Sequence, residues 1–183
     1  MQYYRYQPDA NSFSGLGFSS KHDEWIEQLH DSDMSLIDRW VTPVAHGFVD
    51  NPTIAGDFPS LSNFWRIPIF SQIAWDVLFP LIGYCCEALP IADANGHGYF
   101  VIHVMDTIQA LDLAHAVVSR NATTGRVNRV FRYAFYADKV SEKHIFKLPL
   151  EVGGELIVDG DFRRTVEMNG LRGLLFNELP LIE

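Results

Sequence analysis

Cysteine is scarce in this chain of 183 residues, and the only two, Cys85 and Cys86, are neighbours. A disulfide between adjacent cysteines is strained, and no spaced pair of thiols is available to hold zinc. The sequence therefore excludes a disulfide framework and a thiolate-ligated zinc site. Neither cysteine has a basic neighbour that would favour its thiolate, so we expect no activated nucleophile.

Long apolar runs are also missing. Residues 1–8 contain no apolar core of the length found in signal peptides. The longest apolar run, from Ile73 to Cys86, is interrupted by Asp76 and Pro80 and is too short to span a bilayer. We therefore expect a soluble, cytoplasmic protein without a membrane partner.

Basic residues are few relative to acidic ones. Lys and Arg number 14 and Asp and Glu 23, which gives a formal net charge of −9. Residues 1–60 hold three basic and nine acidic residues, residues 61–120 two and five, and residues 121–183 nine of each. Phosphate binding needs clustered Lys and Arg, so nucleic acid is not expected as a direct partner. The charge suits a basic protein partner, or simply a soluble acidic protein.

The usual cofactor and nucleophile motifs are absent as well. The segment Gly15-Leu16-Gly17 lacks the third glycine and the preceding strand of a dinucleotide fingerprint. No phosphate-binding loop with Gly-Lys-Ser/Thr occurs, and no serine lies in a nucleophile elbow. We therefore predict no catalytic residue and no cofactor.

Seven histidines invite a search for a metal or catalytic site. Glu27 and His30 have the carboxylate–imidazole spacing of di-iron helices, but such sites need the motif twice with further carboxylates. Asp112 and His115 repeat that spacing only weakly. His103 falls in an apolar strand, where a hydrogen-bonded core histidine is the ordinary explanation. We predict no metal site, and keep as the alternative function a small enzyme using His30 or His103 with a nearby carboxylate.

The clearest structural pattern lies near the C-terminus. Two short apolar strands are predicted over residues 144–149 and 155–158, followed by a helix that starts near Gly160 and a third strand over residues 173–179. Asp159 can cap the helix, because its carboxylate can accept from the first free amides. Phe162 and Val166 lie four residues apart on one helical face. Asn169-Gly170 then supplies a left-handed stop.

Hydrophobic periodicity predicts the remaining elements. Helices are expected after Ser20 and after Ser71, and an ordered loop over residues 41–62. Strands are expected over residues 2–6, 87–92, 99–105 and 127–136, while residues 108–118 are ambiguous between helix and irregular strand. The strands over 87–92 and 99–105 are expected to form a hairpin. In the strand over 127–136, Phe131 and Tyr133 are expected on one face. About six or seven strands and three helices, without strand–helix alternation, indicate an α+β fold with a mainly antiparallel, mixed sheet.

Negative charge is densest in residues 23–38, called the acidic segment below. Trp25, Met34 and Trp40 are surrounded by Asp23, Glu24, Glu27, Asp31, Asp33 and Asp38. Acids around large apolar residues suit a basic protein partner, because aromatics supply contact area and charge speeds the encounter. The same pattern fits a solvated helix whose tryptophans point into the core, which is the reading favoured for Trp25 and Trp40. For the acids both readings stay open.

Several of these stretches resemble a known family. The matching segments are 77–81, 87–91, 99–104, 108–112, 145–149, 157–158 and 170–176, with an early strand ending at Pro8-Asp9. In their order and spacing they resemble immunity-protein family eleven of bacterial polymorphic-toxin and type VI secretion systems. Asp159-Gly160 replaces the Ser-Glu helix opening expected for that family. The resemblance implies a single domain over residues 1–183, with residues 1–62 as a variable acidic part and residues 63–183 as a family-like core.

The resemblance also implies a function. Such a protein is a non-enzymatic antitoxin that binds a cognate toxin domain tightly and masks its active site or substrate groove. A cytoplasmic antitoxin meets a toxin acting in the cytoplasm, and an acidic one suits a nuclease with a basic groove. The six acids of the acidic segment are then the expected toxin-binding residues. A small enzyme and a scaffolding module remain as the alternatives.

Overall fold

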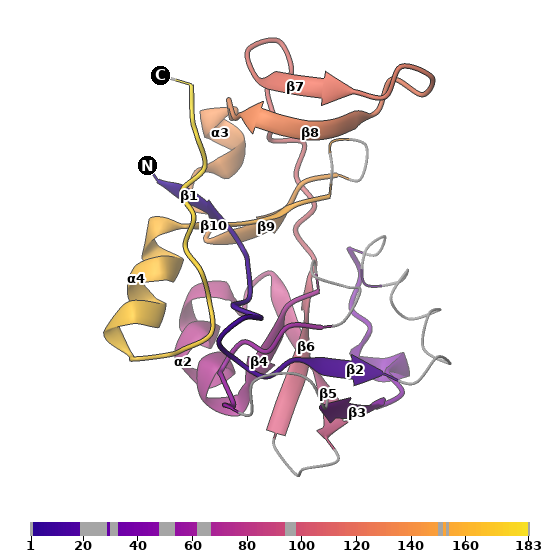
Figure 1. The fold of residues 1–183 in the computed structure, drawn as a ribbon, viewed down its shortest axis with the longest axis vertical. Coiled ribbons are helices and arrows are strands. Elements are labelled where there is room, and N and C mark those ends of the chain that lie inside the picture. The colour runs from indigo at the N-terminus through magenta and orange to yellow at the C-terminus, as the bar shows by residue number, and fades with distance from the viewer. Residues whose placement is uncertain are drawn as a thin grey trace.

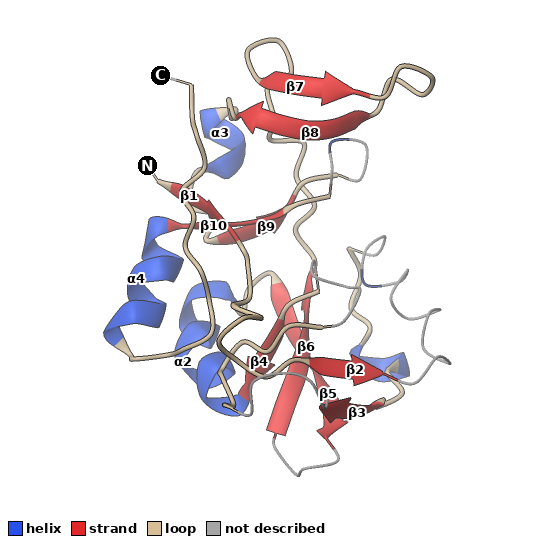
Figure 2. Cartoon of the chain, viewed as in Figure 1, coloured by secondary structure: helices blue, strands red, loops and turns tan. Residues whose placement is uncertain are grey.

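The computed structural model describes residues 2–18, 29, 33–47, 54–61, 67–93, 98–149, 152 and 154–182, and the structural statements below concern these residues. They form ten strands and three α-helices, with one 3-10 helix, η1, at Ile37–Arg39. Figures 1 and 2 show this arrangement. The predicted α+β fold is confirmed, with more strands than the six or seven expected.

The largest sheet has five strands in the order β2-β3-β5-β6-β4. Their bounds are Leu16–Phe18, Val44–Gly47, Cys86–Asp93, Gly98–Val104 and Ile69–Ser71. The predicted hairpin is confirmed as β5 and β6, which pair from Cys86 opposite Val104 to Ala92 opposite Gly98. All neighbours in this sheet are antiparallel except β3 and β5. The sheet is therefore mixed and mainly antiparallel.

The other strands form two smaller antiparallel sheets. One has the order β1-β10-β9, at Tyr3–Arg5, Leu156–Asp159 and Ile145–Lys147. The second is a hairpin of β7 and β8, at Val117–Arg120 and Val127–Arg132. In Figure 1 this hairpin lies at the opposite end of the molecule from the five-stranded sheet.

Helix α2, Gln72–Ile82, begins where the sequence predicts. The Ser71 hydroxyl accepts a hydrogen bond from the amide of Ala74 at 3.0 Å, which satisfies one free donor of the first turn. Pro80 lies inside the last turn, yet the helix continues to Ile82 and the amide of Gly83 still donates to the Phe79 carbonyl. The proline therefore removes one donor without shortening the helix.

Helix α4, Gly160–Met168, also follows its local signals. One oxygen of Asp159 accepts from the amides of Asp161 and Phe162, at 3.1 and 2.9 Å. Gly170 has φ +65°, and the amide of the next residue, Leu171, donates to the Val166 carbonyl. These two features are the expected left-handed stop of the helix. The third helix, α3, is a single turn at Ala137–Val140.

The third strand expected over residues 173–179 is wrong. This segment makes only isolated bridges, with Leu174 opposite Pro8 and Glu178 opposite Tyr4. Gly173 has φ +112°, and a β-carbon there would lie 3.5 Å from the Phe58 backbone. The chain therefore turns sharply at Gly173 and then runs alongside β1 without a continuous ladder.

The strand expected over residues 127–136 is shorter and less regular than predicted. β8 ends at Arg132, and its pairing with β7 shifts twice. These irregularities break the alternation of faces. Phe131 is 47% exposed while Tyr133 is buried, so the two do not share a face as expected.

Upstream, residues 108–118 contain no helix and lead through a turn into β7. The expected loop over residues 41–62 contains β3, and within it Phe58 is buried but Ile54 is exposed.

Three buried clusters hold these elements together. The first packs α2 and α4 on the sheets and includes Phe70, Leu78 and Phe162. A second lies between β1, β9 and the β7–β8 hairpin and includes Tyr133. The third covers the five-stranded sheet, and it takes in Leu29 and Leu36 from the acidic segment. Burial of these two leucines fixes the described part of the acidic segment to the sheet.

Candidate functional site

The structure places two of the six predicted acids. Asp33 and Asp38 are exposed, whereas Asp23, Glu24, Glu27 and Asp31 lie outside the described residues, as do Trp25 and His30. Asp38 forms no ion pair with a described residue. The described part of the acidic segment consists of Leu29 and residues 33–38.

Glu87 of β5 fastens this segment to the sheet. Its carboxylate accepts from the Ser35 hydroxyl at 2.6 Å and from the amide of Leu36 at 2.6 Å. It also lies 2.8 Å from Nδ1 of His103, which is buried on the neighbouring strand β6. Burial raises the pKa of Glu87, but the hydrogen bonds from Ser35, Leu36 and His103 together outweigh it and lower the pKa.

Lys147 and Thr107 provide a second attachment. The ammonium group of Lys147, a buried residue of β9, donates to the Leu29 carbonyl at 3.2 Å and lies 3.9 Å from Asp33. The Thr107 hydroxyl donates to the same Asp33 oxygen at 2.7 Å. Asp33 is thus engaged within the chain, while Asp38 presents its charge to solvent.

Apolar side chains accompany these acids on the surface. Trp40 is partly buried against the third cluster, and its indole donates to the Pro90 carbonyl at 2.9 Å, consistent with the expected core role. Four large apolar residues nearby in the sequence are each more than half exposed: Met34, Ile37, Val41 and Val44. Exposed apolar side chains gathered in one stretch are typical of interaction sites. The stretch can therefore offer contact area and negative charge together.

Two of the candidate histidines, His103 and His115, are described, and both form hydrogen bonds within the fold. The His103 side chain is fully buried against Glu87, so it cannot contact a substrate. His115 bonds to Asp112 at 2.6 Å, and Asp112 also accepts from the amide of Ala114 in a turn. The hydrogen bond from His115 is the main cause that lowers the pKa of Asp112. Both pairs therefore stabilise local structure.

Among the described residues, one group of side chains could hold a metal ion: His144, Asp159 and Asp161 offer ligand atoms within 4.8 Å of one another. However, one oxygen of Asp159 caps α4 and the other lies 2.9 Å from Nδ1 of His144. Asp161 pairs with Arg164 at 3.0 Å. These three side chains thus already take part in hydrogen bonds or an ion pair of the fold.

Cys85 and Cys86 are buried, and their sulfurs lie 3.8 Å apart without a disulfide. Hydrogen bonding from Cys86 is the main cause that lowers the pKa of Cys85, with a smaller effect of Lys143. The thiol is 2% exposed, which keeps it from serving as a nucleophile for an external substrate.

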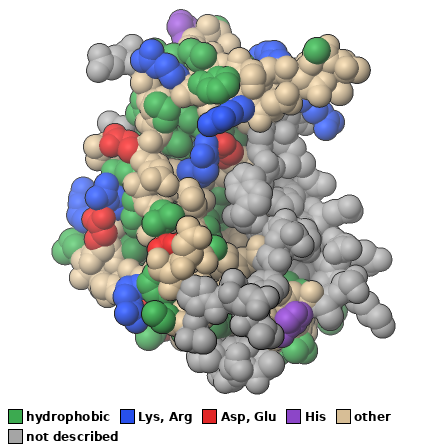
Figure 3. All heavy atoms as spheres, in the orientation of Figure 1, with side chains coloured by type: hydrophobic (Ala, Val, Ile, Leu, Met, Phe, Trp, Pro, Cys, Tyr) green, Lys and Arg blue, Asp and Glu red, His purple; other side chains and the backbone are tan. Residues whose placement is uncertain are grey.

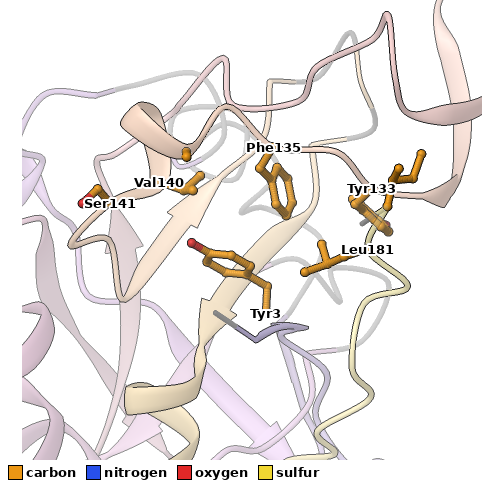
Figure 4. A pocket seen from close by; sticks show the side chains of 8 residues that line it. Tyr3, Tyr133, Phe135, Val140, Ser141 and Leu181 are labelled. Atoms are coloured by element: carbon orange, nitrogen blue, oxygen red, sulfur yellow. The ribbon is translucent and has the colours of Figure 1, made fainter.

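Two hollows lie beside β1. One, of about 360 Å³, is lined by aromatic and aliphatic residues, and Figure 4 shows Tyr3, Phe135 and Leu181 directed toward one another in it. The other, of about 460 Å³, is lined by Arg5, Arg129 and Glu155 among others. There Arg5 donates to Glu155 at 2.9 Å.

Residues 91–180 match the model of an immunity protein family, Imm11. This match confirms the resemblance read from the sequence over that part of the chain. It indicates an immunity protein directed against a toxin. No curated protein matches the chain.

The match begins in β5 and ends in the segment after α4. It thus includes Lys147, Thr107 and His103, which attach the acidic segment or support its attachment, but not the acidic segment itself. Among the described residues, no helix is long and apolar enough to cross a membrane.

The sequence analysis missed Glu87 and Lys147 as attachment points of the acidic segment. A signal was present, because each is a charged residue directly beside apolar residues of a strand. A charge in such a place needs a partner, which here comes from the acidic segment. The partner itself could not be identified, since Leu29 lies 118 positions from Lys147.

The Glu87 network predicts a pH dependence. Because folding lowers the pKa of Glu87, its contribution to stability is present above the unfolded value near 4.5 and is lost as the pH falls through the folded value. We expect the free energy of unfolding, measured by urea titration, to fall less between pH 5 and pH 3 for Glu87→Gln than for the wild type. This pH range extends roughly a unit around the usual glutamate pKa.

Glu167→Gln on the exposed face of α4 is the control, because it leaves the Glu87 network intact. It should keep the wild-type slope. Equal slopes for Glu87→Gln and the wild type would contradict the role assigned to this carboxylate.

Proposed function

We propose that this protein binds and neutralises a cognate nuclease toxin that acts in the cytoplasm. The match of residues 91–180 to the immunity protein family is the observation that carries the proposal. The charge supports the choice of a nuclease, because an enzyme that cleaves nucleic acid holds phosphates in a basic groove. Carboxylates of an acidic chain can take the places of those phosphates.

The acidic segment is the proposed toxin-binding surface, with Asp23, Glu24, Glu27, Asp31, Asp33 and Asp38 as its charged residues. Its exposed apolar side chains support this assignment, because large apolar residues supply the buried centre of an interface and charges its rim. Since Asp33 is held by Thr107 and Lys147, we assign it to shaping the surface and Asp38 to contact with the toxin.

In this proposal the protein acts without catalysis. By occupying the active site or the substrate groove, it keeps nucleic acid from the toxin. Residues 1–62 provide specificity and residues 63–183 the scaffold, and the toxin arrives through a contact-dependent route such as type VI secretion. The hydrogen bonds of Glu87 and Lys147 support this division, because they join the acidic segment to strands of the scaffold.

Inhibition of nuclease activity tests the proposal. The purified product of the adjacent upstream gene should degrade RNA or DNA, and this chain should abolish the cleavage at a one-to-one molar ratio. Addition of this chain alone should leave the nucleic acid intact. A toxin that forms the complex but cleaves no nucleic acid would contradict the nuclease assignment, and continued cleavage at saturating antitoxin would contradict neutralisation.

A further inference from the structure

The β7–β8 hairpin, residues 117–132, is the most basic part of the chain and is called the basic arm below. It holds four arginines and no acidic residue: Arg120, Arg126, Arg129 and Arg132. Since the chain as a whole carries −9, the remainder carries −13. Figure 3 shows Lys and Arg side chains over the part of the molecule that carries β7 and β8.

Most of this positive charge is uncompensated. None of the four arginines forms an ion pair within the described part of the chain. Arg120 donates to the Gly125 carbonyl at 3.0 Å and so fixes the turn of the hairpin. The side chains of Arg126 and Arg132 are exposed and have no hydrogen bond with a described residue, and Arg129 lies 5.2 Å over the Phe131 ring.

The arm is anchored by one face only. Val127 and Val130 are buried in the second cluster, while Val117 and Phe131 on the same two strands are 46% and 47% exposed. An exposed aromatic ring beside arginines is the composition found in the energetic centres of protein interfaces. The second face therefore combines contact area with positive charge.

A hollow continues this face toward β1. Arg129 lines the hollow of about 460 Å³ together with Arg5, Pro8 and Glu155. Glu155 accepts from Arg5 and from the Tyr133 hydroxyl, so its charge is already matched within the fold. Arg129 adds a guanidinium that no described carboxylate matches, which suits a carboxylate from outside.

We propose that the basic arm is a docking surface for an acidic face of the cognate toxin, with a toxin carboxylate seated beside Arg129 in this hollow. The inference rests on the proposed function for the identity of the partner. It adds a second contact, of opposite charge to the first, so that the toxin must present a basic groove to the acidic segment and an acidic face to the arm. Two contacts of opposite charge fix the orientation of the toxin. They also exclude a toxin that has only the basic groove or only the acidic face.

An acidic protein fits the arm better than a nucleic acid does. Nucleic acid binding is driven by the summed positive charge along the phosphate backbone. A chain with −13 outside the arm repels a long polyanion beyond the few phosphates that four arginines cover. A folded acidic patch needs to approach only the arm.

Charge reversal tests the proposal. The variant Arg126→Glu/Arg129→Glu changes two exposed side chains, and Arg164→Glu/Arg172→Glu makes the same change in charge at exposed positions of α4 and the turn after it. The toxin domain encoded upstream is the probe, and association rate and affinity are measured at low and high salt. Thermal unfolding followed by circular dichroism should give the wild-type midpoint for both variants.

We expect the arm variant to bind the toxin at least about tenfold more weakly than the wild type, with most of the loss in the association rate and at low salt. The control should stay within about twofold. Among single variants, Arg129→Ala should lose more affinity than Arg126→Ala, because only Arg129 lines the hollow.

The inference is overturned if the arm variant binds the toxin like the control. It is also overturned if the wild type binds a DNA duplex and the arm variant loses that binding while keeping the toxin. A wild-type chain that does not bind the toxin at all is a different result, because then the proposed function fails and the inference with it.

Discussion

Replacement of Glu24, Glu27 and Asp31 together by lysine is expected to weaken toxin binding by about a hundredfold or more. The variant removes three carboxylates from the acidic segment and places three ammonium groups opposite the proposed basic groove. Attraction is then replaced by repulsion at the same positions. Charge reversal therefore lowers the affinity for the toxin more than removal of the three negative charges would. Affinity measured by titration calorimetry, and association rate measured as salt is raised, report the effect.

A matched control separates position from total charge. Asp76, Asp138 and Glu167 are exposed residues of α2, α3 and α4, and their replacement by lysine gives the same change in net charge. This control should bind the toxin within a few-fold of the wild type. Wild-type affinity in the variant of the acidic segment would mean that the toxin docks elsewhere.

Asp159→Ala is expected to cause the largest loss of stability by a single polar substitution, about 2–4 kcal/mol. The Asp159 carboxylate is buried and accepts from two amides of the first turn of α4 and from His144. Alanine leaves all three donors without that acceptor. For a chain of this size the melting temperature should fall by roughly 5–15 °C, as measured by circular dichroism.

Two further variants identify the cause. Asp159→Asn retains a side-chain oxygen for the helix amides, so it should lose only part of the stability. Asp161→Ala removes an exposed carboxylate of the same turn and should cost less than about 1 kcal/mol. A loss in Asp159→Ala no greater than that in Asp161→Ala would contradict the structural role of this cap.

Local signals in the sequence were sufficient where the determining contacts are close along the chain. The Ser71 cap of α2, the Asp159 cap of α4 and the Gly170 stop each involve residues within a few positions, and all three were predicted correctly. The hairpin of β5 and β6 was predicted for the same reason. In such elements the hydrogen bonds that define the structure are made by neighbours.

Distant pairing was not predictable in this way. β1 pairs with β10, so that Tyr4 lies opposite Val158, and no local pattern specifies that partner. Residues 173–179 are extended and apolar like a strand, but the turn at Gly173 and the contacts with β1 decide their conformation. The irregular pairing of β7 and β8 likewise reversed the expected exposure of Phe131.

The candidate site was only partly visible in the sequence. The acidic segment is evident from composition, whereas its attachment through Glu87 and Lys147 depends on the folded strands. The basic arm was hidden because residues 121–183 were counted together and their charges cancel. A shorter counting window shows four arginines without an acid between positions 117 and 132.

Co-expression with the product of the adjacent upstream gene tests the central claim most directly. The upstream product alone should stop growth, and cells that also express this chain should survive. The two proteins should then elute together from a sizing column as a stable complex. Continued killing in the presence of well-expressed, folded antitoxin, with the two proteins eluting separately, would contradict the account that this protein protects against that toxin.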